Sequence, residues 1–348
     1  MSKTVMNTVD VVISVIIPLY NGADRIGKCL DCLDKQTIRK DFEVLIVDDA
    51  SPDNSAEKVE KSIMQLRNAD RFRVVRCNKN GRAGRARNIG VQEAAGSYIV
   101  FIDQDDYPDN TMLEKLYELT EDGKYDCSAC DVVDKNGKKY HRHPCSHIEA
   151  LTPDIRKDIM GKFGYVFAVL IRKDVLVKNN IVFPENVMFE DVLYNFGWLT
   201  CIKSINTTEE TLYFRDDDDN SQTAFFTTKK LRDRVRATEL YLEHFAEHSI
   251  GKEYSDIINQ FAFYYIFISC IWWMMMSDDL YDTDFFNYCW SKGHLLNINW
   301  KEVLKTQEYF GKIKLIILEV VYYMPALARP LRFAAKIRNM VKQKGNTT

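Results

Sequence analysis

Short apolar runs alternate with amphipathic segments over residues 11–133 of the chain. The apolar runs are rich in β-branched residues, which is typical of strands buried on both faces, and the segments between them have helical spacing. This alternation is the βαβ signature and predicts an α/β fold with a mostly parallel, doubly wound sheet. The predicted strands are Val11–Ile17, Phe42–Val47, Phe72–Arg76 and Tyr98–Ile102, and the predicted helices begin near Ala23 and Asn54, cover Ala83–Ala95, and begin again at Pro108-Asp109.

After residue 125 the pattern is less regular. The dipeptide Asn136-Gly137 between two apolar runs is a strong hairpin signal. From about Thr228 the pattern becomes helical to the end of the sequence. We therefore expect an α/β domain over residues 1–225, which divides into halves of about 11–120 and 121–225. A helical C-terminal region is expected over 226–348. The further predicted strands are Asp126–Val133, Lys138–His143, Val166–Ile171 and Leu212–Phe214.

Charge is balanced over the whole chain but not along it. The sequence has 47 basic and 50 acidic residues, so its net charge does not indicate a nucleic-acid partner. Residues 311–348, however, contain eight Lys or Arg and one acid. The mixture of apolar and basic residues from Ile313 to Met340 is typical of a helix that lies on anionic lipid. A basic helix packed on the core is the alternative, so contact of residues 311–344 with a membrane stays open.

Two features bear on the expected location. The first ten residues contain no apolar core of signal-peptide length. We therefore expect a cytoplasmic protein, with the basic tail as a means of peripheral attachment to the inner face of the cell membrane. The apolar run Phe261–Met276 is interrupted only by Ser269 and is shorter than the about 20 residues of a spanning helix. It predicts a buried helix or a contact between copies of the chain, with a membrane-contacting helix as the alternative.

Carboxylates follow two of the predicted strands. Asp48 and Asp49 close the second strand, and Asp103, Asp105 and Asp106 follow a later one. Open α/β sheets bind ligands beyond the carboxyl ends of their strands, so both groups are expected at one crevice. Hard divalent ions such as Mg²⁺ and Mn²⁺ prefer carboxylate oxygen and commonly bridge it to a diphosphate. Asp also opens turns and caps helices, which is the purely structural alternative.

Other polar groups are predicted on the same rim. The stretch from Asn80 to Asn88 combines two glycines with Arg82, Arg85 and Arg87 but lacks the spacing of a known nucleotide-binding loop. A glycine turn that enters a helix presents backbone N–H groups, and guanidinium groups add donors for a phosphate. A solvated basic helix face is the alternative. Pro18-Leu-Tyr-Asn21 follows the first strand and is placed to touch a ligand or to form a tight turn.

An acidic pair stands before a helical pattern further along the chain. Glu190 and Asp191 precede an amphipathic run. Acids are favoured at helix N-termini for capping and dipole reasons alone. The functional interpretation is a general base on the acceptor side of the crevice.

Taken together, these segments resemble glycosyltransferase family 2, and in particular its bacterial polysaccharide-building members. The resemblance is dense over about residues 11–120, sparse to about 222 and absent beyond. It implies a GT-A fold and inverting transfer of a sugar from a nucleotide donor, usually UDP-linked, with Mn²⁺ or Mg²⁺. The segments that carry it are Ile13-Ser-Val-Ile-Ile-Pro-Leu-Tyr-Asn21, Phe42-Glu-Val-Leu-Ile-Val-Asp-Asp-Ala-Ser51, Ala86-Arg-Asn-Ile-Gly90, Gly96-Ser-Tyr-Ile-Val-Phe-Ile-Asp-Gln-Asp-Asp106 and Phe189-Glu-Asp191.

The resemblance also implies roles for individual residues. Asp49 matches the acid that reads the uracil base, Asp105 the metal ligand of the D-x-D motif, and Asp191 the acid that deprotonates the acceptor hydroxyl. The residues expected to contact the nucleotide sugar are Pro18, Tyr20, Asn21, Asp49, Arg87 and Asp103.

The hypothesis is therefore a metal-dependent inverting glycosyltransferase of surface polysaccharide assembly, such as capsule or O-antigen, acting on a growing or lipid-linked glycan. An inverting transfer is one in-line displacement, which needs a base and charge stabilisation but no protein nucleophile. A non-catalytic nucleotide-sugar-binding or scaffold protein of the same fold is the alternative. A nucleotidyltransferase should show a glycine-rich loop after the first strand, and Pro18-Leu-Tyr-Asn-Gly22 is not one.

Overall fold

The computed structural model describes residues 11–140, 147–160, 165–216, 227–296, 298–306 and 310–331. Internal contacts divide the chain into two compact units. Unit 1 consists of Met1–Ser221 and His244–Gly251, and unit 2 consists of Gln222–Glu243 and Lys252–Thr348. The predicted boundary at residue 225 lies outside the described residues and stays a prediction.

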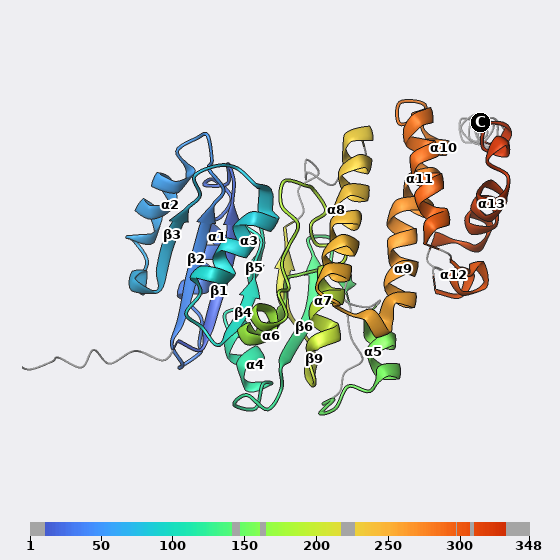
Figure 1. Ribbon diagram of the computed structural model, residues 1–348. Coiled ribbons are helices and arrows are strands. Elements are labelled where there is room, and N and C mark those ends of the chain that lie inside the picture. The colour runs from blue at the N-terminus through green and yellow to red at the C-terminus, as the bar shows by residue number, and fades with distance from the viewer. Residues whose placement is uncertain are drawn as a thin grey trace, which may run out of the picture. The chain divides into compact units, whose positions relative to one another are not determined.

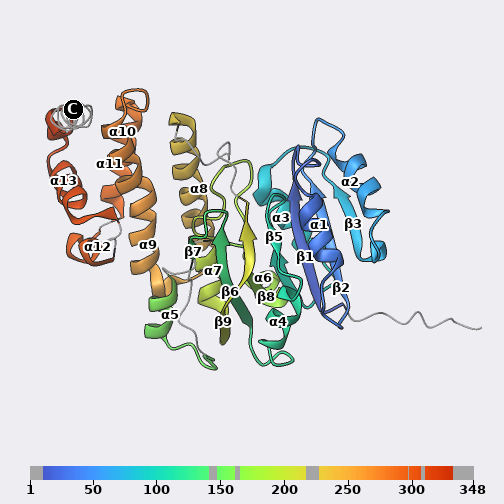
Figure 2. The same cartoon turned by 180° about the vertical axis from the view of Figure 1, so that it is seen from behind.

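Unit 1 is built on one sheet, which has nine strands among the described residues (Figures 1 and 2). The strand order is β3-β2-β1-β4-β8-β6-β9-β5, and β7 pairs with β6. The strands are β1 Ile13–Leu19, β2 Phe42–Asp48, β3 Phe72–Arg76, β4 Tyr98–Phe101, β5 Tyr107–Pro108, β6 Cys127–Asp134, β7 Lys139–Tyr140, β8 Val169–Arg172 and β9 Ile205–Arg215.

The N-terminal half of this sheet is parallel, as predicted. Strand β1 pairs in parallel with β2 and β4, and β2 pairs in parallel with β3. Leu19 lies opposite Asp48, so β1 and β2 end level with each other. The other half is mixed, because β8 is antiparallel to β4 and β6 whereas β9 is parallel to β6. The carboxyl ends of β1, β2 and β4 therefore share one edge, where the loops of interest begin.

Helices cover both faces of the sheet (Figures 1 and 2). Side chains of β1 alternate between the faces. Val15 and Ile17 pack in the same core cluster as Leu30 of α1, whereas Ile16 faces Gly90 of α3. This two-sided packing is the reason that β1 is apolar at successive positions. The helices of unit 1 are α1 Gly27–Asp34, α2 Ser55–Ile63, α3 Arg82–Glu93, α4 Met112–Glu118, α5 Pro153–Met160, α6 Lys173–Lys178 and α7 Tyr194–Cys201, with a short 3₁₀ turn at Ala69–Arg71.

The predicted helix start at Pro108-Asp109 is wrong. Pro108 belongs to β5, which pairs with β9, and α4 begins only at Met112. A proline on an edge strand loses no ladder hydrogen bond. The Asp109 carboxylate accepts hydrogen bonds from the backbone N–H and hydroxyl of Thr111, at 2.9 and 2.7 Å, and so forms a turn rather than a first helical turn.

The half of unit 1 that follows residue 120 contains strands that were harder to predict. The hairpin at Asn136-Gly137 is confirmed, since β6 and β7 are antiparallel and Gly137 has φ 78°. Strand β9, predicted only over Leu212–Phe214, extends from Ile205 because it pairs with β6. The first part of β9 is polar, so local alternation does not reveal it. Of the predicted Lys138–His143 strand, the residues after 140 lie outside the described residues.

Unit 2 is helical and has its own apolar core. Phe263, Phe267 and Ile271 of the predicted apolar run are fully buried in it. The stretch Lys252–Met276 is long and apolar enough to cross a membrane by length and composition, but a buried core helix meets the same criterion, so this is weak support for a span. The helices are α8 Thr228–Glu247, which both units share, then η2 Lys252–Tyr254, α9 Ser255–Phe263, the π-helical turn η3 Tyr264–Ile268, α10 Ser269–Met276, α11 Thr283–Leu295, α12 Trp300–Thr306, α13 Lys312–Tyr323 and η5 Pro325–Leu327.

The close approach of α3 to β1 predicts a specific stability effect. A Cβ atom at Gly90 would lie 2.4 Å from Cγ2 of Ile16, which is buried in β1. We expect Gly90→Ala to lower the free energy of unfolding by about 1–3 kcal/mol, the usual cost of overpacking. Gly27→Ala is the matched control, because nothing lies within 4 Å of its added Cβ atom. Urea denaturation followed by circular dichroism measures both, and equal midpoints for the two variants would contradict the packing described.

Candidate active site

The loops that follow β1, β2 and β4 lie together at the edge of the sheet. The backbone N–H of Tyr20 donates to Oε1 of Gln104 at 2.9 Å, and that of Asn21 donates to the Ser51 hydroxyl at 3.1 Å. A Cβ atom at Gly22 would lie 2.2 Å from Oε1 of Gln104, so a larger residue there would have to displace the Gln104 carboxamide. The structure thus brings the predicted segment after β1 to the acids that follow β2 and β4.

Asp49 is buried at this edge with part of its carboxylate unused. Its backbone N–H donates to Leu19 O at 2.9 Å, and its Oδ1 accepts from Gly81 N at 2.8 Å. Burial raises the pKa of Asp49, and the backbone N–H groups of Gly81 and Arg82 partly offset this. Its Oδ2 has no hydrogen-bond partner among the described residues. Since buried acceptors are normally paired, this oxygen is suited to an N–H donor of a ligand, such as a pyrimidine base.

The glycine turn before α3 contacts Asp49 through its backbone and is not merely a solvated basic surface. Gly81 precedes the helix and donates to Asp49, as described above. The guanidinium of Arg85 donates to Lys79 O at 3.0 Å and to Asn78 Oδ1 at 3.1 Å. Arg85 therefore holds its own loop, while contacts of Arg82 and Arg85 with a phosphate stay predictions.

Arg87 is buried between two carboxylates. Its Nη2 donates to Asp103 Oδ1 at 2.7 Å and its Nη1 to Glu190 Oε1 at 2.5 Å, while the guanidinium lies 5.3 Å from the Phe183 ring centroid. Burial lowers the pKa of Arg87, but Asp103 and Glu190 outweigh it and keep the pKa above the ordinary value. Both terminal nitrogens thus face carboxylates, and the predicted contact of Arg87 with the donor stays a prediction.

The sequence did not reveal that Glu190 pairs with Arg87, or how α3 approaches the segment that contains Glu190. A Cβ atom at Gly84 would lie 2.3 Å from the carbonyl oxygen of Pro184. Only a glycine in α3 lets the segment ahead of Glu190 approach so closely. The signal in the sequence was Gly84 within the basic stretch, but no local pattern says which distant backbone it accommodates.

The carboxylates that follow β4 have different surroundings. The side chains of Asp103 and Asp105 are 31% and 37% exposed, and Asp105 Oδ2 lies 3.2 Å from Nη1 of the exposed Arg25. No group of three or more His, Cys, Asp or Glu residues among the described residues forms a metal cage. Asp105 nevertheless fits Mg²⁺ or Mn²⁺, since such ions are often held by one or two carboxylates together with substrate phosphates and water.

Asp106, for which the sequence indicated no role, is a positioning residue. It is buried, its Oδ2 accepts from the Tyr213 hydroxyl at 2.7 Å, and its Oδ1 accepts from Asp216 N at 3.0 Å. The same hydroxyl accepts from Asp103 N at 3.2 Å. Burial and the charge of Asp103 raise the pKa of Asp106 to about 8. Asp106 therefore connects the acidic turn to the end of β9.

Asp191 lies in the turn that leads into α7, where the sequence predicted it. The turn contains Phe189 at φ 63°, an uncommon conformation for a bulky residue, and Tyr194 N donates to Asp191 O at 3.2 Å. Burial and the charge of Glu190 raise the pKa of Asp191 to about 6, and Arg87 opposes this rise. A carboxylate with a pKa near neutrality is well matched to accepting a proton.

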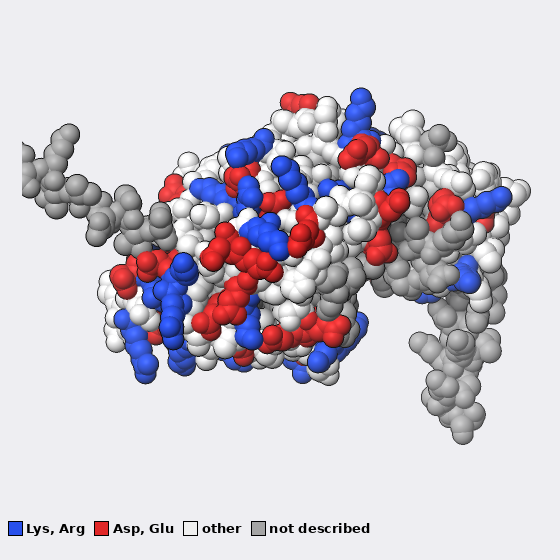
Figure 3. Space-filling view, turned by 90° about the horizontal axis from the view of Figure 1, so that it is seen from below, with Lys and Arg blue, Asp and Glu red and all other residues white. Residues whose placement is uncertain are grey.

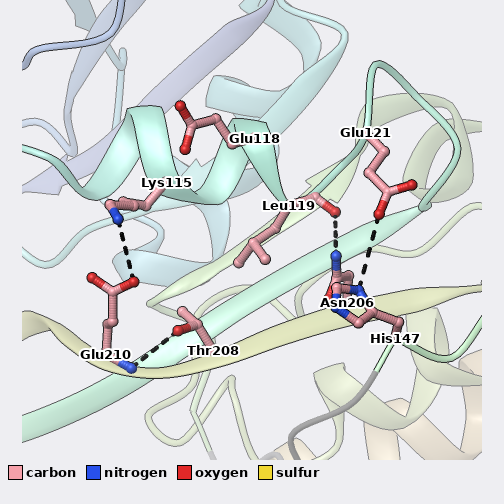
Figure 4. A pocket seen from close by; sticks show the side chains of 8 residues that line it. All are labelled: Lys115, Glu118, Leu119, Glu121, His147, Asn206, Thr208 and Glu210. Carbon is pink, nitrogen blue, oxygen red and sulfur yellow. Dashed lines mark hydrogen bonds and ion pairs between the residues drawn. The ribbon is translucent and has the colours of Figure 1, made fainter.

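A second, polar pocket lies away from this edge (Figure 4). Lys115 pairs with Glu210 at 3.4 Å across it, and Asn206 Nδ2 donates to Leu119 O at 2.8 Å. Asn206 lies at the start of β9, whereas the candidate site adjoins the end of β9. None of the predicted site residues lines the pocket. It is lined by Lys115, Glu118, Leu119, Glu121, His147, Asn206, Thr208 and Glu210.

The charge distribution gives no sign of a nucleic-acid surface on the face shown in Figure 3. Acidic and basic side chains are intermixed there. This agrees with the nearly equal numbers of acidic and basic residues in the sequence. A nucleic-acid site would instead gather basic side chains on one face.

The fold agrees with that of solved glycosyltransferases. The structure of Staphylococcus aureus TarS residues 1–349 in complex with UDP-GlcNAc superposes with a TM-score of 0.67, at 20% identity, and the match covers 90% of this chain and 92% of that one. At this identity the likeness concerns the fold alone. The prediction of a GT-A type sheet with a helical C-terminal region is confirmed.

Comparison of sequences agrees with the resemblance found in the motifs. Residues 14–179 match the profile of glycosyl transferase family 2. It is 30% identical over 221 residues to the uncharacterized glycosyltransferase EpsJ of Bacillus subtilis, covering 61% of this chain and 62% of EpsJ. It is 29% identical over 208 residues to a poly(ribitol-phosphate) beta-glucosyltransferase of Bacillus spizizenii, covering 58% of this chain and 32% of that enzyme. The chain thus spans less than two thirds of either relative.

The buried position of Arg87 predicts a large stability difference between two arginines of this edge. Arg87→Met leaves Asp103 and Glu190 without their cation, and breaking a buried pair is expected to cost about 3 kcal/mol in free energy of unfolding. Arg25→Met removes only a solvent-exposed pair with Asp105 and should cost less than about 1 kcal/mol. Urea denaturation of both variants measures the difference. Similar losses in the two proteins would show that the Arg87 bridge is not buried in solution.

Proposed function

We propose that the protein is an inverting glycosyltransferase that moves a sugar from a nucleotide donor to a hydroxyl group of a glycan. One observation carries the proposal: a single guanidinium, that of Arg87, contacts both Asp103 and Glu190. Asp103 follows β4 at the edge expected to hold the nucleotide, and Glu190 adjoins Asp191, the candidate base. Donor-side and acceptor-side acids are therefore close enough to act on one substrate pair, as a single displacement requires.

On the donor side, the unused Oδ2 of Asp49 supports a nucleoside with an N–H to donate, which a uracil base has. Pro18, Tyr20 and Asn21 adjoin this residue's loop and would line the nucleoside pocket, with Asp103 beside the ribose and sugar. Asp105 would hold Mn²⁺ or Mg²⁺. When bound, such an ion stabilises the negative charge that develops on the leaving diphosphate.

On the acceptor side, Asp191 would accept the proton of the acceptor hydroxyl as its oxygen attacks the anomeric carbon. The bond from that carbon to the diphosphate oxygen breaks in the same step, and its electron pair leaves with the diphosphate. One carboxylate base therefore suffices, and the configuration at the anomeric carbon inverts. The raised pKa of Asp191 makes it a stronger base than an ordinary aspartate while it remains ionised at neutral pH.

The relatives support a UDP-linked hexose or N-acetylhexosamine and a polymer acceptor. TarS was solved with UDP-GlcNAc, and the Bacillus spizizenii relative is named for glucosyl transfer to poly(ribitol-phosphate). We propose an acceptor of the same general kind, a growing or lipid-linked glycan of a surface polysaccharide. The protein would then act in the cytoplasm, at the inner face of the membrane.

A non-catalytic scaffold of the same fold is the competing hypothesis. It requires no base and no metal ligand. The retention of Asp105 and Asp191, and the buried contacts that position the neighbours Asp103 and Glu190, argue against it. The two hypotheses differ in what the substitution of Asp191 does.

Asp191→Asn should abolish transfer but not donor binding. Loss of a general base is expected to lower kcat by a factor on the order of 10²–10⁴. The thermal shift caused by a UDP-sugar with Mn²⁺ should persist in this variant. Asp49→Asn is the matched variant. It should weaken binding of the UDP-sugar by roughly tenfold or more, because the carboxylate oxygen Oδ2, which has no partner in the described part of the chain, loses its negative charge. A screen of nucleotide sugars by thermal shift, followed by a transfer assay, tests both; transfer by Asp191→Asn at the wild-type rate would refute the assigned base.

The rate should fall on the acidic side of a pKa near 6. Only the ionised form of Asp191 accepts a proton, so kcat/KM should drop about tenfold per pH unit below that value. Glu190→Gln removes a charge that raises the pKa of Asp191, and the fall should therefore move to lower pH. Glu185→Gln is the control, because Glu185 lies 3.9 Å from Arg85 and is not among the main charges that shift the pKa of Asp191. A fall at the same pH in the Glu190 variant and the wild type would contradict this assignment.

A further inference from the structure

Helix α13 of unit 2 has two apolar faces, and only one of them is used inside the protein. The inner face packs in the core of unit 2 and consists of Leu315, Leu318, Val321 and Tyr322. The outer side chains Ile313, Ile316, Val320 and Tyr323 are 70%, 53%, 37% and 66% exposed. The sequence left two alternatives for this helix: packing on the core, or contact with a membrane. Each alternative now concerns a different face of the helix.

The outer residues form a continuous stripe. Their spacing of three or four residues places them above one another along the helix. Met324 follows directly and is 56% exposed. Large apolar side chains that are scattered singly on a surface are ordinary, but a continuous row along one helix marks an interaction site.

Positive charge borders the stripe. Lys312 and Lys314 are exposed in the first turn of α13, and Arg329 is exposed beyond its end. Lys312 lies on the side of the helix that carries the stripe, whereas the Lys314 ammonium lies 5.3 Å from the ring centroids of Trp272 and Phe310, which pack against the core of unit 2. The one acid of the helix, Glu319, is only partly exposed. The sequence adds five basic residues and no acid over 332–348.

We propose that this face of α13, made of Ile313, Ile316, Val320 and Tyr323, lies on the surface of an anionic lipid bilayer. The apolar stripe would enter the boundary of the acyl chains while Lys312 remains among lipid phosphates. Tyr323 suits that depth because its ring is apolar and its hydroxyl polar. The inference does not rest on the proposed transferase activity, since it concerns another surface of the chain.

A second copy of the chain is the competing occupant of the stripe. In a twofold contact residue i of one copy meets residue j of the other, so a stripe paired antiparallel with itself would place the first turn of α13 beside the last turn of the partner helix. Residues 320–323 of that last turn carry no acid to pair with Lys312. Anionic lipid complements both the stripe and its positive border, so the charge pattern favours the bilayer.

The test uses the full chain and sedimentation with vesicles of phosphatidylglycerol and phosphatidylcholine in roughly equal parts. Ile316→Gln/Val320→Gln should weaken binding on the order of tenfold or more, and binding should fall with added salt. Met64→Gln/Val177→Gln is the matched control, because these apolar side chains are 73% and 58% exposed in unit 1, and its binding should equal that of the wild type.

These substitutions are preferable to deletion of residues 311–348, which would also remove the buried Leu315 and Leu318 from the core of unit 2. Far-ultraviolet circular dichroism and the thermal midpoint should be unchanged in both double variants. The proposal would be overturned if the wild-type protein did not bind anionic vesicles, or if the Ile316→Gln/Val320→Gln variant bound them as tightly as the wild type. So would analytical ultracentrifugation showing a lipid-independent dimer that only the stripe variant loses.

Discussion

The candidate site depends on a buried cation held between two carboxylates. Arg87 in α3 contacts Asp103 after β4 and Glu190 before α7, with almost no exposure of its own side chain. A buried guanidinium without partners would be strongly unfavourable, and two partly buried carboxylates without a cation between them would repel each other. Each group therefore stabilises the placement of the others, and the three segments keep one arrangement. Because Asp191 follows Glu190 directly, the same bridge sets both the position and the electrostatic surroundings of the candidate base.

The two halves of the sheet contribute different kinds of order to this site. In the parallel half, level strand ends bring the loops after β1 and β2 to one edge through backbone pairing alone. In the mixed half, Tyr213 near the end of β9 reaches back to Asp106 and to the backbone of Asp103. The acidic turn is thus held from both sides, which leaves Asp105 as its most solvent-accessible carboxylate. That arrangement suits an ion that retains water and substrate oxygens.

Unit 2 illustrates how one helix can serve two environments. The inner side chains of α13 are part of an apolar core, and its outer stripe remains exposed beside Lys312. Composition alone describes such a helix simply as apolar and basic. Only the separation of the two faces distinguishes residues that hold the unit together from residues that are available to a surface.

Features that depend on neighbouring residues could be predicted from the sequence alone. Apolar runs and helical spacing predicted the four parallel strands, and their abrupt ends placed Asp49, Asp103 and Asp105 at one edge, because parallel strands expose their carboxyl ends together. The motifs also indicated the resemblance to glycosyltransferase family 2, whose profile matches residues 14–179. Local pattern failed where distant pairing decides: Pro108 is in a strand because β9 lies beside it, and the polar start of β9 is a strand because β6 lies beside it.

Contacts between remote segments could not be predicted from the sequence and are seen only in the folded protein. The partner of Arg87, the anchoring of Asp106 by Tyr213, and the approach of Pro184 to Gly84 join residues far apart in the chain. The two faces of α13 likewise became distinct only once unit 2 was assembled. The physical reason is the same in each case. The burial and the partners of a side chain depend on the groups that the fold places beside it, and these groups cannot be inferred from the residues next to it in the sequence.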